Sequence, residues 1–579
     1  MTHPLIDDRI VDLVLWDVVD AARLTERPRF AEHSRETFEL YLSSCRRLAR
    51  EVLFPTYREM DEDPPVLEDG RVRLHPKMRA AYRQIAELGV VAATRPEDVG
   101  GAGLPTTIAT MAHAYLMAGN LAPTAAAGLT TGAAHLIEAF GTDEVKRAFM
   151  TPMYEGRWSG TMALTEPHAG SSLGDLTTKA VDAGDGTYRI EGSKIFISGG
   201  DGDHVENVVH LTLARIEGAP AGSKGISLFA VPKRRLEGGE LVDNDVEVSG
   251  LIHKIGWRAL PSLALSYGTR GDCHGWLVGE PHRGLRHMFQ MMNEARLMVG
   301  VNAIATASVA YHESLAYARE RTQGRALGER DPAAPPVPIV AHADVRRMLL
   351  RQKAIVDGSL CLAGVTASLA DAHADGDETS RMLLDLLTPV TKSFPAEHGY
   401  ESNVLALQIH GGYGYSSEYL PEAWMRDQKL NSIHEGTTGI QGLDLLGRKV
   451  VAKGGAAFAA FAAAVKADLD ASALDVAPVA EALDRVGALT AALGAKGMSG
   501  DVESMLAHSA DYLELFSVLV IGWMHVKLTN AATGDSDFAK GLRQSARYWW
   551  ATEVGRVDHL ASLCEGSERS YLDMQDAWF

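Results

Sequence analysis

The feature that most limits the possible folds is the spacing of apolar residues, which changes near residue 160 and again near residue 286. Between these points NVVHLTLARI (207–216) alternates apolar with polar side chains, and GISLFAVPK (225–233) is a short apolar run ending at proline. Both patterns are typical of β-strands. On either side apolar residues recur three and four positions apart, as in Leu297, Val301 and Ile304, which is the period of a helix. The sequence therefore predicts an α+β protein with a middle antiparallel β domain between helical segments.

The length of the chain predicts several domains, because 579 residues are more than one core normally holds. We expect an N-terminal α domain (1–160), the middle β domain (161–285), a C-terminal α domain (286–450) and an extra helical domain (451–579). Two segments are predicted loops. PEDVGGAGLP has three glycines in four positions and DPAAPPVP has four prolines in eight, and neither composition continues a helix.

Composition and charge exclude several classes of function. The formal net charge is −19 without any block of basic residues, which argues against nucleic-acid binding. No run of about 18 apolar residues occurs, so we expect no membrane-spanning helix. The N-terminus lacks a basic segment, and the four cysteines are scattered without a CxxC pair. We therefore expect no signal peptide, no metal site, reduced thiols and a cytoplasmic location.

The most informative stretch for chemistry is residues 405–447. Glu435 stands there in the sequence His434-Glu435-Gly436-Thr437, after an apparently helical segment. A carboxylate in a turn rich in glycine and threonine can be exposed to a cleft, although a single loop glutamate is most often only solvated. The same stretch contains the glycine-rich QIHGGYG, and Met425-Arg426-Asp427.

This stretch closely resembles the acyl-CoA dehydrogenase family. Four further segments resemble the family in the same chain order. PEDVGGAG resembles its first-domain loop, MALTEPHAGSS (162–172) its flavin-contacting turn, KIFISGG (194–200) its flavin-side strand, and ARERTQGR (318–325) its phosphate contact. The roughly 130 residues beyond position 450 resemble the larger members, such as very-long-chain and 3-methylthiopropanoyl-CoA dehydrogenases. The resemblance implies that the domain at 286–450 is a four-helix bundle.

The resemblance implies an FAD-dependent enzyme of β-oxidation that converts an acyl-CoA to its trans-2-enoyl form. Glu435 would abstract the α proton, flavin N5 would take the β hydride, and an electron-transferring flavoprotein would receive the electrons. Burial would raise the pKa of such a carboxylate toward neutrality. The backbone N–H of Glu435 and a flavin ribityl hydroxyl would stabilise the developing enolate.

A second glutamate competes for the role of base. Some family members carry the base on the helix that opens the last α domain, and alignment through Arg296 places that position at Ala295. Glu294 is one residue away, and one step along a helix turns a side chain by about 100°. We therefore favour Glu435.

The resemblance also assigns the cofactor and substrate contacts, and no metal ligand. Arg321 and Gln323 would meet the FAD pyrophosphate of a neighbouring subunit, since an arginine fork suits a diphosphate, which implies a homodimer or a dimer of dimers. The expected cofactor-binding residues are Met162, Leu164, Thr165, Gly170, Ser171, Phe196, Ser198, Arg321, Gln323, Gln408, Gly411, Gly412, Thr437 and Gln441. The expected substrate-binding residues are Ser171, Asn293, Glu294, Arg296, His434 and Gly436.

Three questions stay open at this point. His434 stands where the family has an aromatic residue, so it either marks a polar acyl group or is a supporting histidine that hydrogen-bonds the loop. The extra domain is expected to pack within or between subunits, because an acidic chain gains little at an anionic membrane. The alternatives to a dehydrogenase are an acyl-CoA oxidase, a non-dehydrogenase member of the superfamily and a binding protein without activity.

Overall fold

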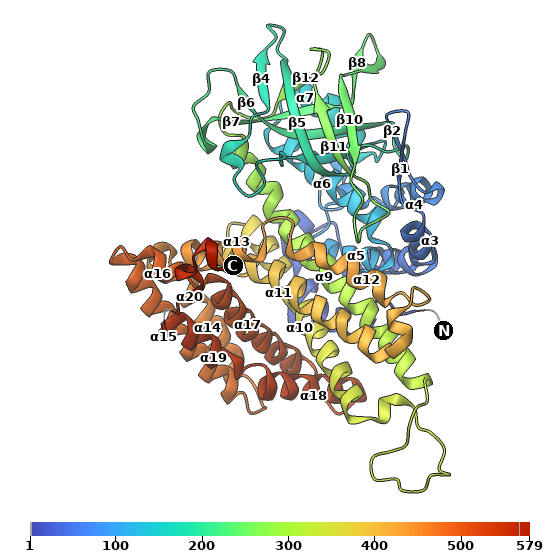
Figure 1. Ribbon diagram of the computed structural model, residues 1–579, viewed down its shortest axis with the longest axis vertical. Coiled ribbons are helices and arrows are strands. Elements are labelled where there is room, and N and C mark those ends of the chain that lie inside the picture. The colour runs from blue at the N-terminus through green and yellow to red at the C-terminus, as the bar shows by residue number, and fades with distance from the viewer. Residues whose placement is uncertain (1–2, 567) are drawn as a thin grey trace. The chain divides into compact units, whose positions relative to one another are not determined.

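The computed structural model describes residues 3–566 and 568–579 (Figure 1). It divides into two compact units, which are described separately. The sheet unit comprises Thr25–Pro105 and Ala112–Met298, and the helical unit comprises Met1–Leu24, Thr106–Met111 and Val299–Phe579. Helices α5 (Thr106–Gly119) and α9 (Gly284–Glu320) contribute residues to both units.

The sheet unit contains the predicted middle β domain as one eight-stranded sheet. Its strands follow the order β10-β11-β5-β12-β7-β6-β3, with β4 paired to β5 and β6. Most pairs are antiparallel as expected, but β3 and β4 run parallel to β6. The bounds are β3 Trp158–Ala163, β4 Lys179–Asp182, β5 Tyr188–Ser198, β6 Asn207–Ile216, β7 Ile226–Pro232, β10 Val246–Leu251, β11 Ser262–Tyr267 and β12 His274–Leu277.

Strand β6 shows how the alternating pattern is used. Its apolar positions are buried as predicted, but His210 and Thr212 on the other face are buried as well. His210 Nδ1 lies 2.8 Å from Thr161 Oγ1 on β3, so the polar face is covered and this ring nitrogen is paired within the sheet. Helix α6 (Leu121–Phe140) lies against β3 so closely that a Cβ at Gly160 would be 2.4 Å from Ala133 Cβ.

A separate hairpin, β8 (Arg234–Glu237) with β9 (Glu240–Asp243), lies between β7 and β10 in the sequence. Most other elements of the sheet unit precede the sheet. They are mostly helical, as the apolar spacing predicted, with one short hairpin that the pattern did not reveal. The principal ones are α2 Arg35–Leu48, α3 Tyr57–Glu62, β1 Val66–Glu68, β2 Arg71–Arg73 and α4 Pro76–Glu87.

The helical unit is built around α10, α11 and α17. Helix α17 comes from the extra C-terminal segment, yet it packs against α10, α11 and α13 as well as α18 and α19. The extra segment is therefore part of the core of this unit. The bounds are α10 Ala343–Ala374, α11 Glu378–His410, α12 Pro421–Lys429, α13 Thr438–Asp444, α14 Ala456–Asp470, α15 Ala477–Met498, α16 Val502–Leu506, α17 Ser509–Ala531, α18 Asp537–Thr552, α19 Arg556–Gly566 and α20 Ser570–Asp573.

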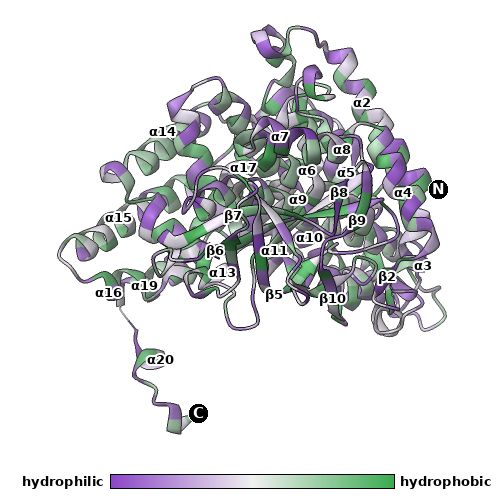
Figure 2. Cartoon of the chain, turned by 90° about the horizontal axis from the view of Figure 1, so that it is seen from above, coloured by the Kyte–Doolittle hydropathy of each residue, from purple (hydrophilic) through white to green (hydrophobic). Residues whose placement is uncertain are grey.

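Two helices, α10 and α17, are long and apolar enough by length and composition to cross a membrane, and the bent pair Thr438–Lys449 with Ala452–Asp470 passes the same test. This test uses length and composition alone, so the expectation of no membrane-spanning helix stays a prediction. In α10 and α17, 83% of the most apolar stretch is buried inside the protein, where the two helices pack on one another. Figure 2 shows the hydropathy of each residue along the chain.

A ring of six alternating charges joins the extra segment to the rest of the helical unit. We call it the charge ring, and its members are Arg351, Glu401, His398, Glu514, Arg556 and Glu553. His398 on α11 lies 3.0 Å from Glu514 on α17. Arg556, at the start of α19, contacts Glu514 at 2.9 Å. Arg351 on α10 closes the ring by contacting Glu553 after α18.

Candidate active site

Glu435 lies in a strained loop that precedes α13. Its φ is 56° and that of Gly436 is 90°, so two consecutive residues are in the left-handed region. For a residue with a side chain this costs about 1–2 kcal/mol, and such strain is concentrated at functional sites. The side chain of Glu435 is half-buried.

Gln441 holds this loop in place through hydrogen bonds to its main chain. Its fully buried side chain reaches back from α13, and Nε2 donates to the carbonyl oxygen of Glu435 at 3.0 Å and to that of Gly436 at 3.5 Å. Thr437 caps α13 by accepting the N–H of Ile440 at 3.4 Å. Gln441 and Thr437 therefore fix the shape of the Glu435 loop.

Helix α13 in turn rests on α17. A Cβ at Gly442 would lie 2.5 Å from the carbonyl oxygen of Ser509 at the start of α17, so only glycine allows this approach. The segment beyond residue 450 thus supports the helix that anchors the Glu435 loop.

His434 is an uncharged imidazole at neutral pH. Burial lowers its pKa to about 3, and the nearby Lys392 ammonium acts in the same direction. The imidazole of His434 therefore adds no positive charge next to Glu435 at neutral pH. A neutral polar wall and a supporting role both remain compatible with the structure.

In the sheet unit, the predicted flavin-contacting turn exposes unused donors. The turn follows β3, in which Met162 is the last residue but one, and both Leu164 and Thr165 are half-buried. Neither the Leu164 nor the Thr165 backbone N–H donates to an acceptor in the described part of the chain. Buried backbone donors are normally paired, so this pair of N–H groups fits a ligand with acceptor atoms. Gly170 and Ser171, further along the turn, are exposed.

Phe196 lies on a strained bulge of β5. Its φ is 61° and it is 61% exposed. The pairing of β5 with β11 shifts register here, which is the signature of a β-bulge and turns the aromatic side chain outward. The neighbouring Ile195 N–H bonds the Thr165 carbonyl oxygen at 2.9 Å. An outward aromatic ring beside unused donors suits a flat ring system such as a flavin, and Ser198 ends the same strand half-buried.

The competing carboxylate, Glu294, is engaged within the sheet unit. Its Oε2 lies 2.9 Å from His135 Nδ1 on α6, and its side chain is 44% exposed. Arg296, two residues on, is buried. The predicted contact by Asn293 concerns a side chain that lies outside the described residues.

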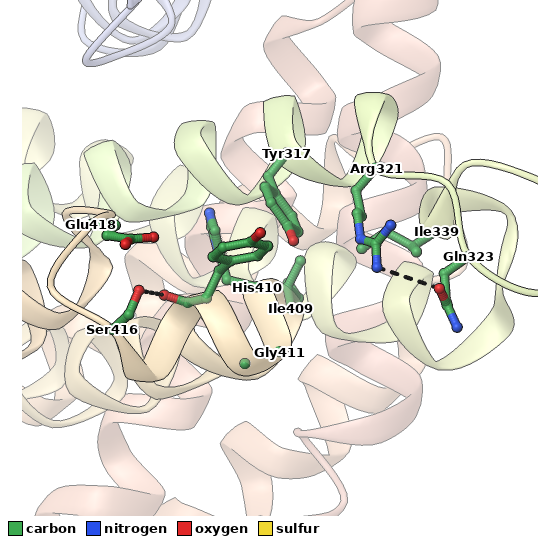
Figure 3. Close-up of a pocket in the computed structure, with 11 residues that line it drawn as sticks. Tyr317, Arg321, Gln323, Ile339, Ile409, His410, Gly411, Ser416 and Glu418 are labelled. Carbon is green, nitrogen blue, oxygen red and sulfur yellow. Dashed lines mark hydrogen bonds between the residues drawn. The ribbon is translucent and has the colours of Figure 1, made fainter.

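A pocket of about 540 Å³ opens where α9 ends beside the loop after α11 (Figure 3). Of the residues predicted to bind the cofactor, the structure brings Arg321, Gln323, Gly411 and Gly412 together in its wall, but not Gln408, which lies exposed on α11. The full lining is Tyr317, Arg321, Gln323, Ile339, Ile409, His410, Gly411, Gly412, Tyr413, Ser416 and Glu418.

The chemistry of this pocket combines a cation with stacked rings. The exposed Arg321 guanidinium donates to the Thr322 carbonyl oxygen at 2.8 Å and to Gln323 Oε1 at 3.3 Å. Tyr317 and His410 stack with centroids 4.3 Å apart. Neither ring was predicted, although Tyr317 precedes Arg321 by four residues, the spacing that places two side chains on one helix face.

Four domain families match the chain in order. They are Acyl-CoA dehydrogenase N-terminal domain (35–157), middle domain (161–267) and C-terminal domain (282–450), followed by Acetyl-CoA dehydrogenase C-terminal like (456–575). The last of these covers the extra helical segment.

Two curated relatives are similar over nearly the whole chain. The 3-methylmercaptopropionyl-CoA dehydrogenase of Ruegeria pomeroyi is 37% identical over 546 residues, which cover 92% of this chain and 90% of the relative. The broad-specificity linear acyl-CoA dehydrogenase FadE5 of Mycobacterium tuberculosis is 33% identical over 599 residues, covering 98% of each.

Solved structures share the fold over the same length. Caenorhabditis elegans ACDH-11 in complex with C11-CoA has a TM-score of 0.77 at 19% identity and covers 97% of this chain and 95% of its own. The Bacillus anthracis acyl-CoA dehydrogenase complexed with FAD has a TM-score of 0.76 at 20% identity, with coverage of 98% and 93%. The domain matches and the two long relatives show that this chain belongs to the acyl-CoA dehydrogenase family of FAD-dependent oxidoreductases.

Proposed function

We propose that this enzyme removes the α proton of an acyl-CoA with Glu435 and forms the trans-2-enoyl-CoA, as a cytoplasmic step of β-oxidation. The observation that carries the assignment is the left-handed Glu435-Gly436 loop held by Gln441. The hydrogen bonds from Gln441 hold the backbone of this strained loop and so fix where the Glu435 side chain leaves it. Positioning of a base is what proton abstraction from a weak carbon acid requires. The backbone N–H of Glu435 is the proposed donor to the thioester oxygen, where it would stabilise the enolate.

FAD, when bound, supplies the acceptor for the hydride that leaves the β carbon. The residues present fit this cofactor. The N–H groups of Leu164 and Thr165 would bond acceptor atoms of the ring, Phe196 would cover it and the Ser198 hydroxyl would reach its edge. Arg321 and Gln323 of a second subunit would hold the pyrophosphate, so the proposed assembly is a homodimer or a dimer of dimers.

The similar proteins suggest the class of acyl group. One relative is named for a sulfur-containing propionyl-CoA and the other for linear acyl-CoA substrates. We therefore place linear acyl chains first, with or without a thioether. The neutral imidazole of His434 adds no charge to the pocket, which is compatible with an uncharged chain.

The test is an anaerobic panel of acyl-CoA substrates scored by loss of flavin absorbance. Short, long, branched, aromatic and thioether-containing chains are compared, and linear chains are expected to bleach the flavin most rapidly. Reoxidation then identifies the electron acceptor: transfer to an electron-transferring flavoprotein without peroxide is expected. Peroxide formed at the rate of turnover would instead indicate an acyl-CoA oxidase, and a yellow protein that no acyl-CoA bleaches would contradict the proposal.

The shape of the Glu435 loop provides a second expected result. In Gly436→Ala the new Cβ would lie 2.6 Å from Gln441 Nε2 in a backbone with φ of 90°, so Gln441 must release the loop. The rate of flavin bleaching should fall by about 100-fold, the effect of misplacing a reacting group by roughly 1 Å, with FAD retained. Gly439→Ala is the matched control, since its Cβ has no neighbour closer than 3.9 Å. Equal rates for the two variants would show that the loop shape is dispensable.

A further inference from the structure

A fully buried carboxylate, Glu166, lies behind the turn that carries Leu164 and Thr165. Its side chain is 2% exposed. Oε2 accepts from Thr177 N and Oγ1 at 2.7 and 2.8 Å, and Oε1 accepts from Thr178 N and Oγ1 at 3.0 and 2.6 Å. Lys194 on β5 places Nζ 2.9 Å from Oε1, and His168 Nε2 lies 3.7 Å from Oε2.

Lys194 also forms a hydrogen bond to the turn itself. Its side chain is completely buried, and Nζ donates to the carbonyl oxygen of Leu164 at 3.0 Å. The next residue on β5, Ile195, donates its N–H to the carbonyl oxygen of Thr165 at 2.9 Å. Two consecutive carbonyl groups of the turn are thus held from β5, one of them by a side chain.

Because the peptide unit is planar, the hydrogen bond to the Leu164 carbonyl also fixes a group on the opposite side of the turn. In a planar trans peptide the C=O and the N–H point in opposite directions. The Leu164 carbonyl and the Thr165 N–H belong to the same peptide plane, so the bond from Lys194 to that carbonyl fixes the direction of the Thr165 N–H. That N–H has no acceptor within the described residues.

We propose that Lys194, locked by Glu166, is a positioning residue for FAD that aims the Thr165 N–H at an acceptor atom of the flavin ring. The inference rests on the proposed placement of the flavin at this turn. An apolar residue at position 194 would fill the same space without orienting the peptide. Glu166 is what keeps the ammonium in place, because a buried charge without a partner is strongly unfavourable.

The charge states at neutral pH suit this arrangement. Burial lowers the pKa of Lys194 to about 8, against the attraction of Glu166. Burial alone would raise the pKa of Glu166, but the Lys194 ammonium and the hydrogen bonds from Thr178 and Thr177 lower it to about 2. Both groups are therefore charged near pH 7, and Lys194 has its donors available.

The test separates positioning of the cofactor from stability of the fold. Lys194→Met is compared with the double variant Lys194→Met/Glu166→Gln, which lacks the same donor but has no unpaired buried charge. Three readouts are taken from each: the Kd for FAD in titrations of the apoprotein, the shape of the visible flavin absorption band, and Tm. Lys353→Met is the control, since Lys353 is a lysine of α10 in the helical unit that pairs with Asp357 at 2.6 Å.

We expect Lys194→Met to weaken FAD binding by about 10- to 100-fold, the range for a buried hydrogen bond left incomplete, and to change the band shape. The double variant should have a Tm close to the wild-type value, but it should still bind FAD weakly and show the changed absorption band. The control should have a lower Tm than the wild type, with an unchanged Kd for FAD and an unchanged flavin absorption band. The inference is overturned if the FAD affinity of the double variant recovers together with its Tm, or if Lys194→Met behaves like the control. A wild-type protein that binds FAD but is bleached by no acyl-CoA would contradict the proposed function alone.

Discussion

Glu435→Gln is expected to bind FAD and unfold at the wild-type temperature, but to bleach with acyl-CoA about 10³- to 10⁴-fold more slowly. An amide has the shape of the carboxylate and cannot accept the α proton, and removal of a positioned general base has an effect of this order. The measurement is a stopped-flow rate of flavin bleaching under anaerobic conditions at saturating substrate. Because the loop backbone is held by Gln441 through main-chain oxygens, the substitution leaves the loop support in place.

Glu294→Gln is the matched control for this result. Glu294 lies one residue from the alternative position of the base and contacts His135, so its substitution should alter the bleaching rate by less than about tenfold. If Glu294→Gln abolishes bleaching while Glu435→Gln bleaches normally, the base lies on α9 and the assignment of Glu435 is wrong.

The second large effect is expected at the charge ring. Glu514→Gln removes the carboxylate that contacts both His398 and Arg556, so each cation keeps only one of its two carboxylate partners in the ring. Loss of one partner of a buried pair costs about 3–5 kcal/mol. Because Glu514 is 25% exposed, we expect the free energy of unfolding to fall by about 2–4 kcal/mol, measured by urea denaturation. The control is Glu565→Gln, whose surface pair with Arg485 should contribute less than about 1 kcal/mol.

The same ring predicts how stability depends on pH. Burial alone would lower the pKa of His398, but Glu514 and Glu401 raise it to about 9, well above the unfolded value of about 6.5. A raised pKa stabilises the fold fully below the unfolded value, and this contribution is lost as the pH rises through the folded value. The free energy of unfolding should therefore fall between about pH 6.5 and 9 in the wild type, and this fall should be much smaller in Glu514→Gln. An equal fall in both proteins would show that His398 is not the group responsible.

The order of helical and β segments could be predicted because hydrophobic period reports burial directly. Glu435 could be proposed because its neighbours form a recognisable motif. The pattern could not reveal that Gln441 folds back onto the loop, or that Glu435 is left-handed, since both depend on backbone angles. The burial of Lys194 could not be predicted either. In KIFISGG it stands as a polar residue at the end of a strand pattern, and its partner Glu166 belongs to a different segment.

The contact of Gly442 with the first residue of α17 has a practical consequence for anyone shortening the gene. The domain match that contains Glu435 ends at residue 450, which makes that position the natural place to stop an expression clone. Such a clone would lack the surface on which α13 rests, together with half of the charge ring. If the truncated protein is inactive, the cause would be loss of support for the Glu435 loop. The result would not be evidence for a separate role of residues 451–579.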